Sequence, residues 1–574
     1  MPALRLSGGE ALLRSLEPEQ IPFVAGIVGG KLAPFLQALF TRPHIRFIGT
    51  RHEGHAAMMA SAVGAISGQL GLAVGECGGG GANMLPGAAI ARSNSLPMFI
   101  ITSNNQHWQS YPSRGMFAEM DNQALFAPAT KWNAVVHDGR RIPELVRSAL
   151  RQAFSGRPGP VHLDVPQDVL RGSFEYEDSE FSRTPSQYRL LQPPAPGQSE
   201  LVAAVRILRS ARRPLLIAGG GLTLAGAAEQ FRQLALRLQA PALATQMGNG
   251  AIAGGAADFL GMAWVCGGDA VHRALGEADA VLAVGCRFSS WLRNDRGTLL
   301  NPDAKLIHID SDATVIGQHA PITVGICADA RATLAALDNA LGDEANSGRD
   351  VSWFESLRTT RREWQARLAT LAAAPGSPMH PAAAAAQVAA ALPADALAVF
   401  DGGHSTFWSN DFMPAPAPRT RFNEPGMSQL GFGLPWALTA KLLHPSRPVF
   451  NVTGDGAFGF SLQELDTARR HGLPVITVVY NNAQWGVIRL AYGRAGFDFG
   501  SGNDFGTMLS GTDYAAIARG FGCHGEVVES AQQVGPAIRR ALDSGLPAVI
   551  DCRTQFVPHP AMPHFGRMSS AGAG

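Results

Sequence analysis

The sequence lacks several features that would assign it to a broad class of protein. Its 47 basic and 46 acidic residues leave a formal net charge of +1, so charge gives no reason to expect binding to nucleic acid or to an anionic membrane. No run of about 18 uninterrupted apolar residues predicts a membrane span. The six cysteines form no CxxC pair, which argues against a zinc or disulfide framework and predicts reduced thiols of a cytoplasmic protein. The N-terminus lacks a long apolar core and carries Glu10 and Glu17, so no signal peptide is expected.

What the sequence does have is length and a regular alternation of apolar runs. A chain of 574 residues is too long for one hydrophobic core. Two stretches have the composition of linkers: one at 175–200, charged and then rich in Pro, and one at 341–381 that holds a short helical piece. We therefore predict three domains and a tail, with the bounds 1–175, 195–342, 376–560 and 561–574.

Each predicted domain alternates short Val, Ile and Leu runs with Ala- and Leu-rich helical stretches. In the middle domain, RPLLIAGGG, ADAVLAVGC and AKLIHIDSD are apolar runs that end in Gly, Cys or Asp. Fully buried parallel strands have this pattern. The fold class predicted is α/β, with three doubly wound domains whose sheets are mainly parallel.

The stretch 449–486 carries the clearest chemistry. VFNVT is a predicted strand, Gly454-Asp455-Gly456 is the turn after it, and a helical segment and a second strand, VITVVY, follow. Asn482 comes 27 residues after Asp455, at the carboxyl end of that second strand. Because a right-handed crossover brings both strand ends to one edge of the sheet, Asp455 and Asn482 are expected to lie close together.

A carboxylate and an amide oxygen at such an edge suit a hard divalent cation. Mg²⁺ prefers oxygen ligands and takes the rest from phosphates and water. The glycines let the backbone approach a diphosphate, and the following helix offers free N–H groups at its start. A Gly-rich turn beside an ordinary Asn turn is the alternative, and the Asn pair at the second strand end favours the metal diphosphate.

This spacing of GDG and NN resembles the thiamine diphosphate signature. The chain resembles the superfamily of acetolactate synthase, pyruvate decarboxylase and benzaldehyde lyase along nearly its whole length. The resemblance implies a pyrimidine-binding, a central and a diphosphate-binding domain. It also implies that Mg²⁺ is bound by the side chains of Asp455 and Asn482 and by the backbone carbonyl of Gln484.

The resemblance further implies a catalytic glutamate in the first domain, and Glu53 stands there in an RHE segment between a predicted strand and helix. In the family this carboxylate hydrogen-bonds a ring nitrogen of the cofactor and starts general base catalysis. A glutamate favoured by the dipole of a helix N-terminus is the alternative for this residue taken alone.

Other segments match family loops residue by residue. GECGGGGAN resembles TSGPGATN, DGGHSTFW resembles the loop that takes the diphosphate, and GMSQLGFGLP resembles GLGTMGFGLP. In that last segment Leu430 would wedge the cofactor into its bent form, and the Ser428 carbonyl would hold its exocyclic amine. The implied cofactor-binding residues are Glu53, Asn83, Gly403, His404, Ser405, Ser428, Leu430, Gly454, Asp455, Gly456, Ala457, Asn482, Trp485 and Gly486.

The positions that set substrate choice depart from the known relatives. Val28 stands where acetolactate synthases carry Pro, Gln167 replaces their Lys, and Ala491 stands where they place a Trp. The candidate substrate residues are Val28, Asn104, Gln106, His107 and Asn122. His107 is as well explained as a packed or exposed loop residue. Glu76 faces either the pocket or the surface, and the tail 557–570 is either a lid or a flexible end.

The central domain resembles the one that carries FAD in acetolactate synthases. IAGGG and VGCRFS fit its general pattern, but CRFSSWL lacks the RFDDR element. FAD, a coenzyme A nucleotide and no ligand all remain open.

The sequence therefore predicts a thiamine diphosphate- and Mg²⁺-dependent enzyme that decarboxylates 2-oxoacids and joins or breaks a C–C bond next to a carbonyl. One alternative is a lyase for acyloins, cyclic diketones or 2-hydroxyacyl-CoA. The alternative from another class is a non-catalytic, nucleotide-binding regulatory homologue. Small-molecule 2-oxoacids or acyloins are the expected partners. The resemblance implies a homodimer, or a dimer of dimers, whose sites are shared between chains.

Overall fold

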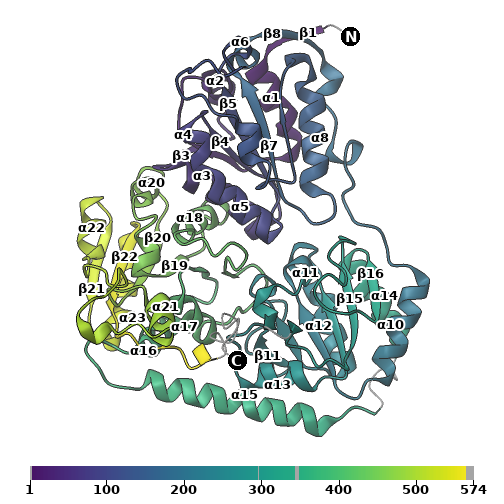
Figure 1. Cartoon of the computed structure of the whole chain (residues 1–574), viewed down its shortest axis with the longest axis vertical. Coiled ribbons are helices and arrows are strands. Elements are labelled where there is room, and N and C mark those ends of the chain that lie inside the picture. The colour runs from purple at the N-terminus through teal and green to yellow at the C-terminus, as the bar shows by residue number, and fades with distance from the viewer. Residues whose placement is uncertain (1–2, 111, 295–296, 343–347, 564–574) are drawn as a thin grey trace. The chain divides into compact units, whose positions relative to one another are not determined.

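The computed structural model describes residues 3–110, 112–294, 297–342 and 348–563 (Figure 1). Contacts divide these residues into two compact units. Unit 1 comprises residues 3–191, 424–447 and 461–475, and unit 2 comprises the remainder. Two segments of the predicted third domain thus pack with the first domain.

The main sheet of unit 1 has six parallel strands in the order β3-β2-β4-β5-β7-β6. The strands are β2 (Phe23–Gly26), β3 (Arg46–Gly49), β4 (Gly71–Gly75), β5 (Met98–Asn104), β6 (Trp132–Val135) and β7 (Pro160–Pro166). All residues of β2, β4, β5 and β7 are buried, as expected for strands with helices on both faces. The strand order reverses between β2 and β4, and such sheets bind ligands at the carboxyl ends beside that switch point.

Helices cover this sheet. One core joins it to α1 (Gly8–Leu16), α2 (Ala33–Phe40), α8 (Ile142–Phe154) and α9 (Gln167–Arg171). The central helix α3 (Glu53–Ser67) packs against β4, α5 (Leu85–Asn94) and α18 (Gly433–Leu443). Its sequence is apolar nearly all round, which explains why residues 54–66 are all buried. The other elements of unit 1 are β1 (Ala3–Ser7), which pairs antiparallel with β8 (Ser173–Glu177), α4 (Gly79–Asn83), α6 (His107–Ser110), α7 (Asn122–Phe126) and α20 (Glu464–Arg470).

Unit 2 contains two further six-stranded parallel sheets. The central sheet has the order β11-β10-β9-β12-β15-β16, and the other has the order β18-β17-β19-β20-β22-β21. The central strands are β9 (Pro214–Ala218), β10 (Ala242–Ala244), β11 (Phe259–Met262), β12 (Ala280–Val284), β15 (Lys305–Asp310) and β16 (Val324–Cys327). The other strands are β17 (Leu397–Phe400), β18 (Arg421–Phe422), β19 (Val449–Gly454), β20 (Val475–Asn481), β21 (His524–Val528) and β22 (Ala548–Arg553).

The strand orders separate the three sheets into two kinds. The sheets of β2–β7 and β17–β22 share one order, in which the first strand lies between the second and the third. The central sheet instead has the 3-2-1-4-5-6 order of dinucleotide-binding folds. The predicted fold class, three doubly wound α/β domains, is confirmed. Among the described strands, antiparallel pairing is limited to β1 with β8 and to the short hairpin of β13 (Arg293–Asn294) and β14 (Gly297–Thr298).

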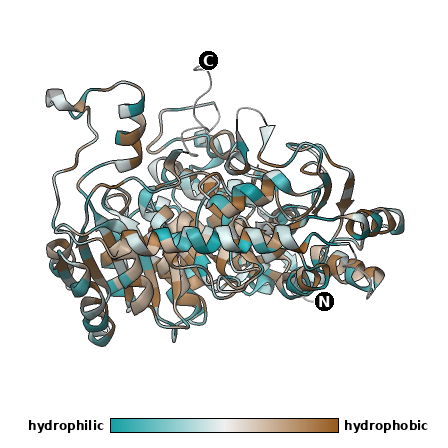
Figure 2. Ribbon diagram, turned by 90° about the horizontal axis from the view of Figure 1, so that it is seen from below, coloured by the Kyte–Doolittle hydropathy of each residue, from teal (hydrophilic) through white to brown (hydrophobic). Residues whose placement is uncertain are grey.

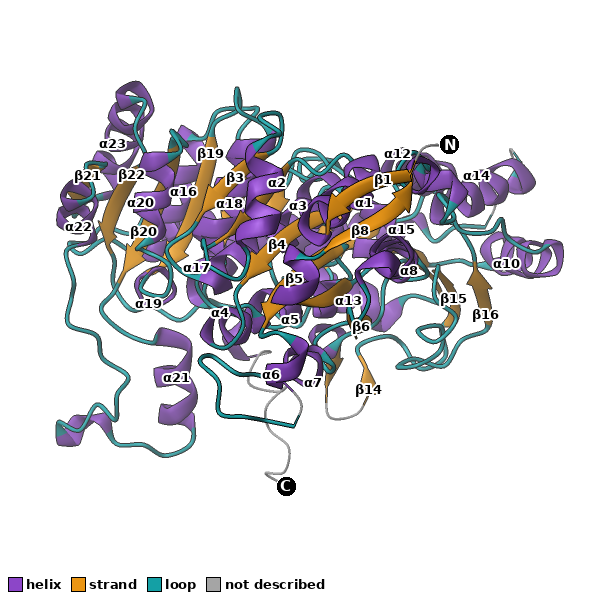
Figure 3. Cartoon of the chain, turned by 90° about the horizontal axis from the view of Figure 1, so that it is seen from above, coloured by secondary structure: helices purple, strands orange, loops and turns teal. Residues whose placement is uncertain are grey.

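Helices flank both sheets of unit 2. Around the central sheet they are α10 (Gln198–Ser210), α11 (Gly220–Leu224), α12 (Ala228–Leu238), α13 (Asp269–Glu277) and α14 (Ala330–Leu341). Around the other they are α16 (Pro381–Ala391), α17 (His404–Phe412), α19 (Asp455–Phe458), α21 (Gly486–Arg494), α22 (Tyr514–Gly520) and α23 (Ala531–Ser544). Figure 3 shows α21 set apart from the strands, and none of its residues is buried.

The helix expected in the second linker is longer than predicted. It is the 22-residue helix α15 (Val351–Ala372). Trp353, Leu357, Trp364 and Leu368 form its buried stripe, and the hydrophilic residues lie on its outward side (Figure 2). Among the described residues, no helix has both the length and the hydropathy for a membrane crossing.

Candidate active site

The two strand ends of the GDG and NN motif meet in unit 2. Asp455 follows β19, and Asn482 follows β20, as the sequence predicts. The Asp455 carboxylate lies against the backbone N–H groups of Asn482, Ala483 and Gln484. Gly456 N–H also donates to its Oδ1 at 2.8 Å. The crossover therefore brings together residues that are far apart in sequence.

The Asp455 side chain has the properties of a cation ligand. Its Oδ2 is buried and makes no hydrogen bond with any described residue, and burial raises the pKa of Asp455 to about 6. A buried carboxylate oxygen without a donor is costly unless a cation is bound to it. No cluster of three His, Cys, Asp or Glu side chains that could hold a metal is found in the described chain. One carboxylate, an amide and a carbonyl instead fit a Mg²⁺ that takes its other ligands from a diphosphate and water.

Glycines hold the neighbouring loops against one another. A Cβ on Gly402, whose φ is +95°, would lie 2.6 Å from Ser405 Oγ and 3.4 Å from Gly454 N. A Cβ on Gly456 would lie 2.5 Å from the Trp485 ring. The loop after β17 is therefore packed against the backbone of the loop after β19, and that loop lies against the Trp485 ring. Ala457 is buried in the same cluster, and Gly403 is close to Val487.

His404 begins α17 at this cluster. Both of its ring nitrogens are buried and have no hydrogen-bond partner in the described part of the chain, and a Cβ on Gly486 would lie 3.1 Å from its Nδ1. Burial lowers the pKa of His404 to about 3, so the ring is neutral at pH 7 and one nitrogen carries a proton. Together with the free N–H groups at the start of α17, this ring fits a phosphate group.

In unit 1, Glu53 is the first residue of α3. The His52 side chain caps this helix by accepting from Gly54 N at 3.0 Å. Asn83 Nδ2 donates to Glu53 Oε2 at 3.0 Å, and no described residue donates to Oε1. A Cβ on Gly80 would lie 3.6 Å from Oε1, so a glycine there keeps the space beside the carboxylate open.

Comparisons with known proteins match all three domains. Residues 6–125, 201–337 and 401–552 match the N-terminal TPP-binding, central and C-terminal TPP-binding domains of the thiamine pyrophosphate enzymes. The chain is 30% identical to a probable acetolactate synthase large subunit of Methanococcus aeolicus, over 95% of this chain and 92% of that relative. It is 31% identical to the acetolactate synthase large subunit of Parasynechococcus marenigrum, over 95% and 87%.

The chain belongs to the thiamine pyrophosphate enzymes. The resemblance seen in the sequence is thereby confirmed. The TPP-binding domains imply thiamine diphosphate as the cofactor, and Mg²⁺ is typical of the family.

Two buried glutamates that the sequence reading missed hold the implied cofactor segments of this thiamine pyrophosphate enzyme. On α20, fully buried Glu464 accepts from Arg51 N at 3.1 Å and lies 2.8 Å from His55 Nδ1. It therefore fixes the RHE segment that carries Glu53. The sequence signal for Glu464 was a glutamate that follows the GDG turn and stands beside the apolar positions of a helix.

The second is Glu424, which shapes the loop of Ser428 and Leu430. Its carboxylate accepts from the backbone N–H of Gly426, Met427 and Gln429 at 2.7–3.0 Å. Ser428 has a φ of +56°, a left-handed conformation that this clamp stabilises. Ser428 is exposed and Leu430 is half-buried, so both are accessible to a ligand.

The five substrate candidates have different surroundings. Asn104 and Asn122 are buried and donate to Asp164 at 2.5 and 2.9 Å, in a network that also includes Thr102. Because both side chains are buried, both have a structural role. Their contact with a substrate stays a prediction. His107 Nδ1 pairs with Asp168 Oδ2 at 2.9 Å, and Gln106 accepts from Trp108. Val28 is 71% exposed.

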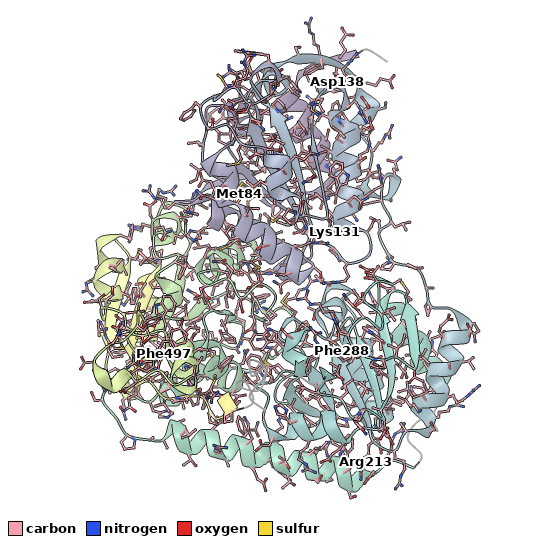
Figure 4. All side chains as sticks on the ribbon, in the orientation of Figure 1. Met84, Lys131, Asp138, Arg213, Phe288 and Phe497 are labelled. Atoms are coloured by element: carbon pink, nitrogen blue, oxygen red, sulfur yellow. The ribbon has the colours of Figure 1, made fainter. Side chains whose placement is uncertain are left out.

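The loops at the central switch point pack closely. A Cβ on Gly221 would lie 2.8 Å from Gly285 Cα, and one on Gly220 would lie 2.8 Å from Met247 Cβ. In the triple glycine after β9, Gly221 leaves room for the loop after β12, which approaches it closely. Phe288, labelled in Figure 4, follows that loop and is buried with a φ of +50°.

Part of the predicted tail packs within unit 2. The His559 ring lies 4.5 Å from the Trp408 ring, His559 Nε2 is 3.2 Å from Asp411 Oδ2, and Met562 is buried. Residues 564–574, where the rest of the expected lid or flexible end falls, lie outside the described residues. Glu76 accepts from Lys31 N at 3.1 Å, so its carboxylate supports the 29–31 loop.

Proposed function

We propose that this thiamine pyrophosphate enzyme decarboxylates a 2-oxoacid and transfers the remaining fragment to a second carbonyl compound. Its similarity to acetolactate synthases over 95% of the chain, with Glu53 and Asp455 both present, supports the proposal. Thiamine diphosphate, when bound, supplies a carbon nucleophile and an electron sink for the bond next to the carbonyl.

The residues have separate tasks in this proposal. Asp455, Asn482 and Gln484 would hold Mg²⁺, and His404 and the start of α17 would bind the diphosphate. Asn83 fixes one oxygen of Glu53, so that the other can hold and move a proton at the pyrimidine ring. Glu464 and Glu424 keep the two supporting segments in place without contacting the reacting atoms.

A substrate screen tests the proposal. The protein reconstituted with thiamine diphosphate and Mg²⁺ is offered 2-oxoacids, acyloins and acyl-CoA compounds, and release of CO₂ and new C–C products are measured. Consumption of a 2-oxoacid is the expected result. Cleavage of acyloins or 2-hydroxyacyl-CoA alone would favour the lyase, and no turnover of any compound would favour the regulatory homologue, which has no use for the Glu53 proton relay.

We expect each active site to be shared between two chains. If one chain provides Glu53 and its partner Asp455, co-expressed Glu53→Ala and Asp455→Ala chains form mixed dimers in which one site has neither lesion. Activity absent from each variant alone is expected to return in the mixture. Differently tagged chains that purify together and stay inactive would contradict the shared site.

The central domain has a dinucleotide-binding strand order but no RFDDR element. The missing RFDDR element favours a protein without FAD. We expect the purified protein to lack yellow colour and its thermal midpoint to be unchanged by added FAD. Yellow protein that releases FAD on denaturation would contradict this expectation.

A further inference from the structure

An ammonium group that has no acidic partner among the described residues lies at the switch point of the first sheet. Lys31 follows β2, and Cys77 follows β4, the two strands between which the order reverses. Lys31 Nζ donates to Cys77 Sγ at 2.9 Å and to Phe117 O at 3.3 Å, and it lies 5.5 Å from the centre of the Phe117 ring. In the part of the chain that the structure describes, these are its polar partners, and none is a carboxylate.

The nearest acidic side chain serves another purpose. Glu76 Oε1 accepts from the backbone N–H of Lys31, and its Oε2 is turned toward Gly29. This carboxylate therefore holds the loop and forms no ion pair with the Lys31 ammonium. Nζ has three protons and two of them are used, so one donor is left for a ligand.

The site lies close to the catalytic carboxylate of the same unit. A Cβ on Gly80 would lie 3.6 Å from both Glu53 Oε1 and Glu76 Cβ, which places Glu53 beside the loop that holds Lys31. Val28, which precedes Lys31 in the sequence, is 71% exposed. Phe117, whose ring lies beside Lys31 Nζ, is 86% exposed. A cation beside exposed apolar groups suits a small organic anion with an apolar substituent.

We infer that Lys31 binds the carboxylate of the second, accepting 2-oxoacid, and so directs the enzyme to keto-acid acceptors. This inference rests on the proposed function. The carboxylate that leaves as CO₂ loses its charge in the transition state, so an ammonium would stabilise the reactant more and slow the step. The acceptor keeps its carboxylate throughout, and a charge-assisted hydrogen bond to it helps binding without that penalty.

The experiment compares acceptors for one donor. Wild type, Lys31→Met, Lys31→Arg and the exposed control Lys305→Met are given a 2-oxoacid donor with either a 2-oxoacid or a neutral aldehyde acceptor. Lys31→Met is expected to raise the KM for the 2-oxoacid acceptor by about 10- to 100-fold, the range for losing a hydrogen bond to a charged group. Donor decarboxylation, aldehyde products and thermal midpoint are expected to stay near wild type, and Lys31→Arg is expected to restore part of the acceptor affinity.

The outcomes are distinguishable. Unchanged acceptor KM in Lys31→Met overturns the inference and leaves the proposed function intact. If Lys31→Met loses activity equally with both acceptors, Lys31 has a structural role, and the inference is overturned. It is also overturned if Lys31→Met unfolds and Lys31→Arg is no more active than Lys31→Met with the 2-oxoacid acceptor. Wild type that consumes no 2-oxoacid removes the proposed function itself.

Discussion

Thiamine diphosphate is expected to lose tight binding when Asp455 is replaced by alanine. Asp455 is the one carboxylate in the implied ligand set, and within the described residues its buried Oδ2 makes no hydrogen bond. Replacing a residue that contacts only the ligands of a metal typically lowers metal affinity 10- to 100-fold. Loss of a ligand itself is therefore expected to lower the affinity for thiamine diphosphate at least about 100-fold. Isothermal titration with thiamine diphosphate at fixed Mg²⁺ measures the change.

A matched control separates the metal from general damage. Asp543 is exposed on α23, and Asp543→Ala is expected to bind the cofactor like wild type. Asp455→Ala removes a buried charge, so its fold is checked by circular dichroism. A folded Asp455→Ala protein with unchanged cofactor affinity would rule out the metal role.

Turnover is expected to fall at least about 100-fold when Glu53 is changed to glutamine, the lower part of the range for general base catalysis. Glutamine keeps the size of the side chain, and its amide oxygen still accepts from Asn83, so α3 and the loop of Gly80 are expected to stay in place. What is lost is a group that can take up and return a proton. The measurement is kcat with saturating cofactor and the best substrate from the screen.

Comparing the change in kcat with the change in cofactor affinity tests the role of Glu53 more specifically than turnover alone. Glu53→Gln is expected to change kcat far more than the Kd for thiamine diphosphate, because Asp455 and the glycine loops are untouched. Glu529→Gln, an exposed change of the same kind, serves as control. Near-normal turnover in Glu53→Gln would mean that the proton relay does not pass through this residue.

Local patterns in the sequence predicted most of the fold. RPLLIAGGG, ADAVLAVGC and VFNVT are continuous apolar runs, and β9, β12 and β19 are the buried strands that result. The strand-helix-strand pattern around Asp455 and Asn482 also predicted their approach, since handedness leaves one arrangement. The length of α15 was missed because its composition is charged and its apolar stripe is narrow.

Contacts between distant segments could not be predicted in this way. Glu464 and His55 are 409 positions apart, and Asn94 and Glu424 are 330 apart. No periodicity encodes which buried carboxylate meets which donor, because that depends on how separate elements pack. Lys31 escaped notice for the same reason: its neighbours Cys77 and Phe117 come from two other loops.

The membership of α18 and α20 in unit 1 bears on how the chain is made. When the ribosome has synthesised the chain as far as β8, all strands of the first sheet are present. The packing partner α18 of α3 and the Glu464 that binds the RHE segment have not yet been synthesised. These partners emerge only after the whole central domain has been synthesised. Until then the apolar surface of α3 stays uncovered, which is the condition under which nascent chains need chaperones. Fragments that end before residue 475 are therefore expected to be poorly soluble, however complete the first domain looks in the sequence.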